Sequence, residues 1–179
     1  MCGQIAGLVA DTLRDRQVEI VVEDLAGTGF DPVISQRELA HYFDGPVPVD
    51  VAALVEHVRA AEELIFVLPI WMYAMPALLK GYFDRVWRPH VSFELEDGRI
   101  RPLLLGVKRL TVIATHGMTK DVCDEVGDGT RAYFATSLPS SLPGLVSNTR
   151  FDLYGIDTLG REAISREIAR IREHFAARR

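Results

Sequence analysis

The chain has little cysteine, no excess of positive charge and no apolar run long enough to cross a membrane. Its two cysteines, Cys2 and Cys123, show no C-x-x-C spacing, which excludes a disulfide scaffold and indicates unpaired thiols in a reducing cytoplasm. The chain has 20 Lys and Arg against 25 Asp and Glu, a net charge of −5. It therefore lacks the excess of positive charge that binds the phosphates of nucleic acid. The most apolar uncharged run, Leu64–Leu79, is interrupted by two prolines and is shorter than the roughly 20 residues that span a bilayer. No basic segment followed by an apolar run opens the chain, so we expect no secretory signal and a cytoplasmic location.

What is present is the composition of an ordinary globular domain. Hydrophobic residues make up 48% of the 179 residues and charged residues 25%, both close to the averages for folded proteins. This length is typical of one domain, so we expect residues 1–179 to form a single domain around one core.

Four segments have the composition of β-strands. Val18–Leu25 is rich in β-branched residues and is followed by glycines, whereas Leu64–Leu68 is apolar without alternation, as in a strand covered on both faces. Leu110–Thr115 is a second buried run, and Phe151–Ile156 is predicted as the last strand. Asp97-Gly98, within residues 91–104, predicts a small hairpin.

Helical periodicity separates these strands. Apolar residues three and four apart predict helices over residues 2–16, 35–42, 51–58, 76–87 and 159–177. Ser35 has the spacing of a capping box, Asp50 is predicted as an N-cap, and Pro76 as a first helical residue. The alternation of strands and helices predicts an α/β fold with a doubly wound parallel sheet.

Two loops follow buried strands and are therefore candidate binding loops, since ligands of open parallel sheets lie at the carboxyl ends of the strands. They are Pro69–Met75 and Thr115–Thr119. The first offers aromatic side chains and exposed amides, which suit a flat heteroaromatic ligand. An equally good interpretation is that Trp71, Met72 and Tyr73 are core or dimer-contact residues.

The stretch PIWMYAMPALLKGYFDRVW, residues 69–87, resembles the flavin-contacting strand, loop and helix of flavodoxin-like NAD(P)H:quinone oxidoreductases, the DT-diaphorase type and its bacterial relatives. Further matches cover most of the chain in the expected order. They are Asp24-Leu25, Phe30-Asp31-Pro32, the hairpin before Leu103-Leu104, Thr115-His116-Gly117 and the late strand with Gly155.

The resemblance implies a flavodoxin-like sheet with strand order 2-1-3-4-5 and a flavin, FAD or FMN, over the two loops. The implied cofactor-binding residues are Pro69, Ile70, Trp71, Met72, Tyr73, Thr115, His116 and Gly117. In that family, NAD(P)H reduces the flavin, which then reduces a quinone in the same pocket by ping-pong kinetics. From the residues themselves we also expect a homodimer, since Trp71, Met72, Tyr73, Trp87 and the excursion at residues 91–104 offer more apolar surface near the site than one small domain covers.

His116 is the one histidine at a predicted strand end, so it is the candidate catalytic residue. It could donate a hydrogen bond to the flavin or to a reduced quinone, but a solvent-exposed loop histidine is as plausible. The other histidines form no Cys/His cluster, so we expect no metal site.

The chain departs from the family at its beginning. The family's first strand and the phosphate-binding loop after it have no counterpart before the helix at residues 2–16. We favour a start assigned too far downstream over a true truncation or a decayed copy. A form extended upstream by that strand and loop is therefore expected to bind flavin and to be more stable than the chain as given.

Two other functions remain open at this level. Some relatives are regulatory subunits of potassium-efflux transporters, and flavodoxins are electron carriers without a substrate. Turnover of a quinone by the purified protein distinguishes an enzyme from a regulatory subunit. The long loop at residues 69–76 favours a reductase over a carrier. The choices between NADH and NADPH, and among quinone, nitro and azo acceptors, stay open.

Overall fold

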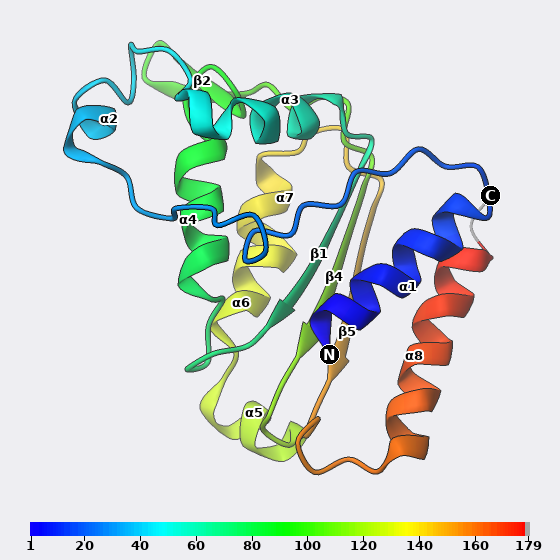
Figure 1. Ribbon diagram of the computed structural model, residues 1–179. Coiled ribbons are helices and arrows are strands. Elements are labelled where there is room, and N and C mark those ends of the chain that lie inside the picture. The colour runs from blue at the N-terminus through cyan, green and yellow to red at the C-terminus, as the bar shows by residue number, and fades with distance from the viewer. Residues whose placement is uncertain (178–179) are drawn as a thin grey trace.

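The computed structural model describes residues 1–177, with a parallel three-stranded sheet at its centre (Figure 1). The strands run in the order β1 (Glu63–Pro69), β4 (Arg109–Thr115) and β5 (Ser147–Leu153). Helices cover both faces, so the predicted α/β class with a parallel sheet is confirmed.

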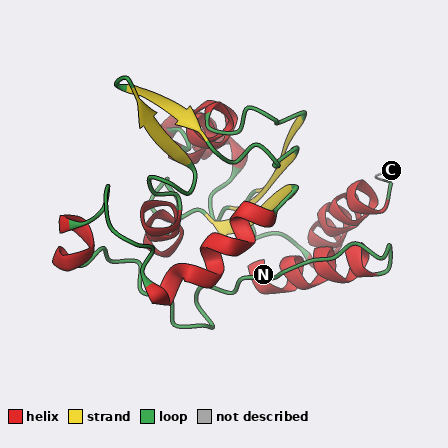
Figure 2. Ribbon diagram, turned by 90° about the horizontal axis from the view of Figure 1, so that it is seen from above, coloured by secondary structure: helices red, strands yellow, loops and turns green. Residues whose placement is uncertain are grey.

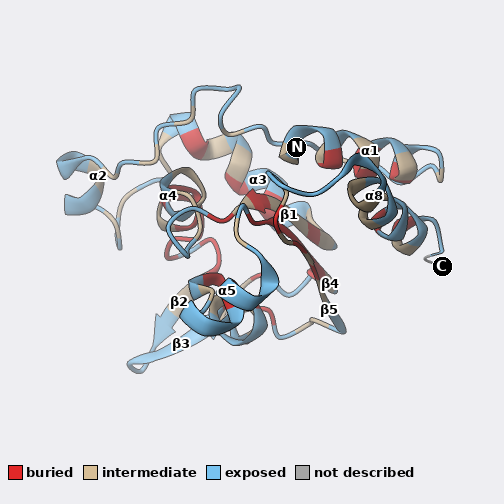
Figure 3. Cartoon of the chain, turned by 90° about the horizontal axis from the view of Figure 1, so that it is seen from below, coloured by how far each residue is buried: buried red, intermediate tan, exposed pale blue. Residues whose placement is uncertain are grey.

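Each face of the sheet has its own helical layer. On one face α1 (Cys2–Arg14) and α8 (Arg161–Ala176) lie side by side over Ile113 and Phe151 (Figure 2). The opposite face is covered by α3 (Ala52–Ala60), α4 (Ala77–Val86), α6 (Gly129–Ala132) and α7 (Leu138–Ser140). Buried residues concentrate in the strands and on the inward sides of these helices (Figure 3).

The predicted helices are present, with ends displaced by at most two residues. α2 (Gln36–Ala40) is capped by Ser35, whose Oγ accepts a hydrogen bond from the Glu38 N–H at 3.1 Å. Asp50 is not the N-cap of α3; it lies in a 3₁₀ turn, Val49–Val51, and pairs with Arg85 at 2.8 Å. The prediction of an Asp50 cap was therefore wrong, because a tertiary ion pair holds that carboxylate.

The sequence pattern predicts no helix or strand over residues 120–146. They form α5 (Lys120–Val126), α6, a π-helical turn at Tyr133–Ser137 and α7. β5 begins at Ser147, four residues before the predicted start of that strand at Phe151. The hairpin predicted at Asp97-Gly98 is confirmed as β2 (Phe93–Glu96) and β3 (Arg99–Pro102), with both turn residues at positive φ.

The predicted strand Val18–Leu25 is wrong in this structure. Its first seven residues have no ladder partner, and the last lies in a turn. Val21 and Val22 are 54% and 49% exposed, while Ile20 packs on the layer of α1 and α8. A β-branched run has the propensity for a strand, but a strand forms only where a neighbour supplies hydrogen bonds.

One edge of β1 is unpaired within residues 1–177. The Ile70 N–H donates to the Thr115 carbonyl at 2.8 Å, and the Glu62 carbonyl accepts from the Lys108 N–H at 2.8 Å. Even-numbered residues of β1 therefore direct their backbone groups toward β4. Those of Ile65 and Val67 consequently face the open edge.

A long connection, residues 30–50, is held on α4 by Arg85. This buried guanidinium bonds Glu38 at 3.1 Å and the carbonyl of Asp31 at 2.8 Å, in addition to Asp50. Burial lowers the pKa of Arg85, but its partners Asp50 and Glu38 outweigh that effect and raise it. Cys2 and Cys123 are both free, and among the described residues no helix is long and apolar enough to cross a membrane.

The contact between this connection and α4 leaves room only for glycine. A Cβ at Gly81 would lie 2.3 Å from Pro32 Cβ and 2.4 Å from its carbonyl oxygen. We expect Gly81→Ala to lower the free energy of unfolding by about 1–3 kcal/mol because the helix and connection must move apart. Gly7→Ala is the matched control, since it places a methyl in open space on α1 and should stabilise the protein by up to about 1 kcal/mol. Denaturant unfolding checks both; equal stability of the two variants would contradict this packing.

Candidate functional site

The carboxyl ends of the three strands meet at one edge of the sheet. Pro69 is in register with Thr115, and Thr115 with Leu153. The Ile70 N–H donates to the Thr115 carbonyl at 2.8 Å, and the His116 N–H donates to the Leu153 carbonyl at 2.8 Å. The structure therefore brings together the two loops that the sequence singles out, each at the end of its strand.

The loop after β1 is a tight turn that presents its tip to solvent. Trp71 and Ala74 exchange two backbone hydrogen bonds of 3.0 Å, and Met72 and Tyr73 between them have φ of 47° and 64°. Trp71 is 68% exposed, Met72 86% and Tyr73 42%, whereas Ile70 is buried. The interpretation of Trp71, Met72 and Tyr73 as core residues is therefore wrong. Among the described residues, the Met72 and Tyr73 N–H groups donate to no protein acceptor.

The start of α1 lies at the same edge. Cys2 Sγ is 3.3 Å from the Thr115 hydroxyl, although the two residues are far apart in sequence. No side chain caps the first turn of α1, so its N–H groups are open to a ligand and carry the partial positive charge of a helix N-terminus. At the neighbouring loop, Gly117 permits a close approach, because a Cβ there would lie 2.7 Å from Asp157 Oδ2.

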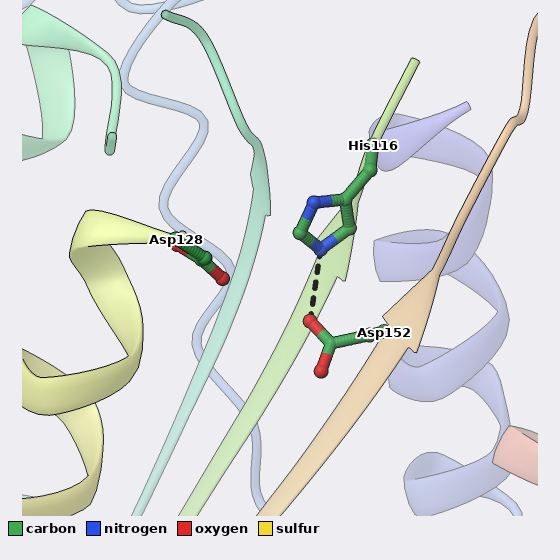
Figure 4. A group of neighbouring side chains, drawn as sticks. All are labelled: His116, Asp128 and Asp152. Atoms are coloured by element: carbon green, nitrogen blue, oxygen red, sulfur yellow. Dashed lines mark hydrogen bonds and ion pairs between the residues drawn. The ribbon is translucent and has the colours of Figure 1, made fainter. Parts of the chain in front are cut away.

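His116 is completely buried, so the alternative that it is a solvent-exposed loop residue is wrong. Its Nε2 lies 2.9 Å from Asp152 Oδ1 (Figure 4), its Nδ1 lies 3.6 Å from Cys123 Sγ, and its ring stacks on Tyr154 at 4.6 Å. Both ring nitrogens thus have protein partners. The imidazole is therefore held by side chains from β5, α5 and the segment after β5.

Sequence reasoning missed the charged groups around this histidine. Asp128 and Asp152 lie beside His116 with their nearest ligand atoms all within 4.8 Å of one another (Figure 4). Both carboxylates already accept hydrogen bonds from Arg150, and Asp152 also accepts one from Arg131 at 3.0 Å. These guanidinium groups compensate the charges that a metal ion would otherwise balance.

A signal for this cluster was available in the sequence. Arg150 and Asp152 are two apart in a strand, so they share a face, and Asp128-Gly129-Thr130 has the pattern of an aspartate cap. The structure shows that cap: Asp128 Oδ1 accepts from the Thr130 N–H at 2.8 Å and from its hydroxyl at 2.7 Å.

Three comparisons place this geometry among known proteins. A profile of the family described as flavodoxin-like fold matches residues 1–175. A Haemophilus influenzae protein named uncharacterized NAD(P)H oxidoreductase is 28% identical over 165 residues, which cover 89% of this chain and 81% of that protein. The FMN-dependent NADH:quinone oxidoreductase of Leptothrix cholodnii is 28% identical over 187 residues, which cover 97% of this chain and 85% of that protein. The structure of an NAD(P)H:quinone oxidoreductase from Methanothermobacter marburgensis superposes with a TM-score of 0.80 at 22% identity, covering 98% and 90%, which shows the shared fold.

Asp152 gives the cluster a measurable acid dependence. Burial tends to raise the pKa of Asp152, but the hydrogen bond from His116 and the charges of Arg150 and Arg131 outweigh it and lower the pKa to about 2. A carboxylate with a lowered pKa stabilises the fold fully above about pH 4, and this stabilisation is lost as the pH falls toward 2.

We therefore expect the melting temperature of the unmodified chain to fall more steeply between pH 4 and pH 2 than that of Asp152→Asn. The difference corresponds to roughly 2 kcal/mol. Asp121→Asn, which removes an exposed carboxylate of α5, is the matched control and should keep the original slope. Parallel curves for the chain and Asp152→Asn would show that Asp152 is not held ionised by its partners.

Proposed function

Because the chain belongs to the family of flavodoxin-like fold, we propose that it is an NAD(P)H:quinone oxidoreductase that works with a bound flavin. The observation that supports this proposal is the convergence of three features at one edge of the sheet. They are the exposed turn Trp71–Ala74, the loop at Thr115–Gly117 and the uncapped start of α1. The names of the relatives favour FMN as the flavin and a quinone as the acceptor.

The residues at this edge fit a flavin. An isoalloxazine ring needs flat apolar area and donors for its polar edge, and Trp71 and Tyr73 supply the first while two unpartnered amides supply the second. Its phosphate needs a group of N–H donors, which the first turn of α1 offers beside Thr115. When bound, the flavin supplies the hydride chemistry, accepting from NAD(P)H and donating to the quinone.

The protein's part is to bind and orient. The N–H groups of Met72 and Tyr73 would hold the polar edge of the ring, while the backbone groups of Trp71 close the turn on Ala74. Pro69 and Ile70 fix the base of the loop on the sheet. Thr115 and Gly117 line the adjoining loop. His116 does not donate to the substrate. It bonds Asp152 and Leu153 and thereby holds the ends of β4 and β5 together beneath the binding loops.

The first test is flavin binding and turnover. Purified protein mixed with FMN or FAD should retain flavin on desalting and absorb near 450 nm. Without oxygen, it should oxidise more than one equivalent of NADH or NADPH per flavin only when a quinone is present. Trp71→Ala should weaken flavin binding by roughly tenfold, because stacking of one aromatic ring contributes about 0.5–1.5 kcal/mol beyond its buried area. Val146→Ala, an exposed apolar residue at the amino end of β5, is the control and should bind as before. Protein that retains neither flavin contradicts the proposal.

We also infer a homodimer. Exposed apolar side chains are numerous for a chain of this size, and they include Trp71, Met72, Phe43 and Ile100 of the hairpin. Closed two-fold pairing is the commonest way in which such surface becomes buried. Equilibrium sedimentation at micromolar concentration should give twice the chain mass of 20.0 kDa. A single species of that chain mass would contradict the inference.

A further inference from the structure

The exposed turn at residues 71–74 is tied to a segment more than fifty residues later in the chain. The Gly129 N–H, at the first position of α6, donates to the carbonyl oxygen of Tyr73 at 2.7 Å. A Cβ at Gly129 would lie 3.0 Å from that oxygen, so the two backbones are in close contact. The position of Tyr73 therefore depends on what holds Gly129.

Arg150 of β5 holds the residues on both sides of Gly129. Its Nη2 donates to Asp128 Oδ2 at 2.5 Å, and its Nη1 donates to the Thr130 hydroxyl at 3.0 Å. Asp128 has a side chain only 1% exposed, and Thr130 is fully buried. One planar guanidinium thus fixes both neighbours of the glycine whose N–H bonds the turn.

Arg150 is itself fixed from the opposite side. Its Nε donates to Asp152 Oδ1 at 3.0 Å, and the same oxygen bonds His116 Nε2 at 2.9 Å. His116 follows β4 directly, while Arg150 and Asp152 belong to β5. The rigid sheet is therefore connected through Arg150 and Gly129 to the carbonyl of Tyr73.

We propose that Arg150 is a positioning residue for the cofactor, which acts through Gly129 to hold the turn Trp71–Ala74 in the conformation that binds the flavin ring. This inference rests on the proposed function for its consequence in flavin binding. The tie between Arg150 and the turn is a property of the flavin-free protein and can be measured without cofactor.

Two variants of Gly129 test its contact with Tyr73. Gly129→Ala adds a Cβ and keeps the N–H donor, whereas Gly129→Pro also replaces the N–H hydrogen by a Cδ that points at the Tyr73 carbonyl oxygen. Proline is tolerated at the first position of a helix, and Asp128 before it has φ of −126° and ψ of 106°, which suits a residue preceding proline. The difference between these variants therefore reports the loss of the bond from Gly129 to Tyr73 together with the displacement of the Tyr73 carbonyl oxygen.

Two variants of arginine complete the design. Arg150→Met removes the guanidinium group that bonds Asp128 and Thr130. Arg150→Lys keeps the positive charge but cannot bond both residues in the planar geometry of a guanidinium. Arg109→Met is the matched control, because Arg109 also pairs with a carboxylate from a strand, Glu63 at 3.1 Å, but at the amino end of the sheet.

The first measurement is amide hydrogen exchange in the flavin-free protein. The N–H groups of Trp71 and Ala74, which close the turn, should exchange about tenfold faster in Gly129→Pro than in Gly129→Ala. They should also exchange faster in Arg150→Met than in Arg109→Met, with Arg150→Lys between. If Arg150→Met fails to fold, the Gly129 pair decides. Unchanged exchange in Gly129→Pro would overturn the proposal.

The second measurement is the dissociation constant for FMN by fluorescence titration. It should rise about tenfold in Gly129→Pro relative to Gly129→Ala, while the melting temperatures of the two flavin-free variants stay close. Equal dissociation constants in these two variants would overturn the positioning role. If the unmodified chain binds no flavin, the proposed function fails, and hydrogen exchange alone then decides whether Arg150 holds the turn.

Discussion

The in-register parallel pairing of β1, β4 and β5 is the constraint on which the site depends. Because Pro69, Thr115 and Leu153 are opposite one another, each loop leaves the sheet at the same level. Parallel strands also require a crossover between them, and these crossovers supply the helices that cover both faces. A shift of one residue in either pairing would turn the apolar side chains of a strand to the wrong layer and separate the loops.

The parts of the fold that the sequence predicted are those in which a local pattern agrees with tertiary packing. The apolar run Leu64–Leu68 lacks alternation because Phe66 packs on one helical layer and Ile65 and Val67 on the other. Val18–Leu25 is also rich in residues with a high propensity for strands but remains unpaired, since pairing depends on a neighbouring strand and composition does not report one. Asp50 shows a similar limit, because a capping residue can be drawn to a buried arginine instead.

The candidate site was partly visible in the sequence. Both loops at the strand ends could be located from apolar runs followed by glycine, proline and aromatic residues, because this pattern is local. The role of His116 could not be derived, since burial against Asp152 and Cys123 depends on the packing of β5 and α5. Arg150 was overlooked for a related reason. A charged residue in a strand is expected to face solvent unless its buried partners, here Asp128 and Thr130, are known.

The unpaired edge of β1 has a consequence for how the protein behaves in concentrated solution. Edge strands with free N–H and C=O groups are templates on which another chain can add by β-sheet hydrogen bonding, which leads to aggregation. Here the row without a ladder partner is short and is limited at both ends. Glu63 places a charged residue at its beginning, and Pro69 has no N–H to offer at its end. Only the central residues Ile65 and Val67 remain as a nucleus for such addition, so removing the charge at Glu63 would lengthen the surface on which self-association can begin.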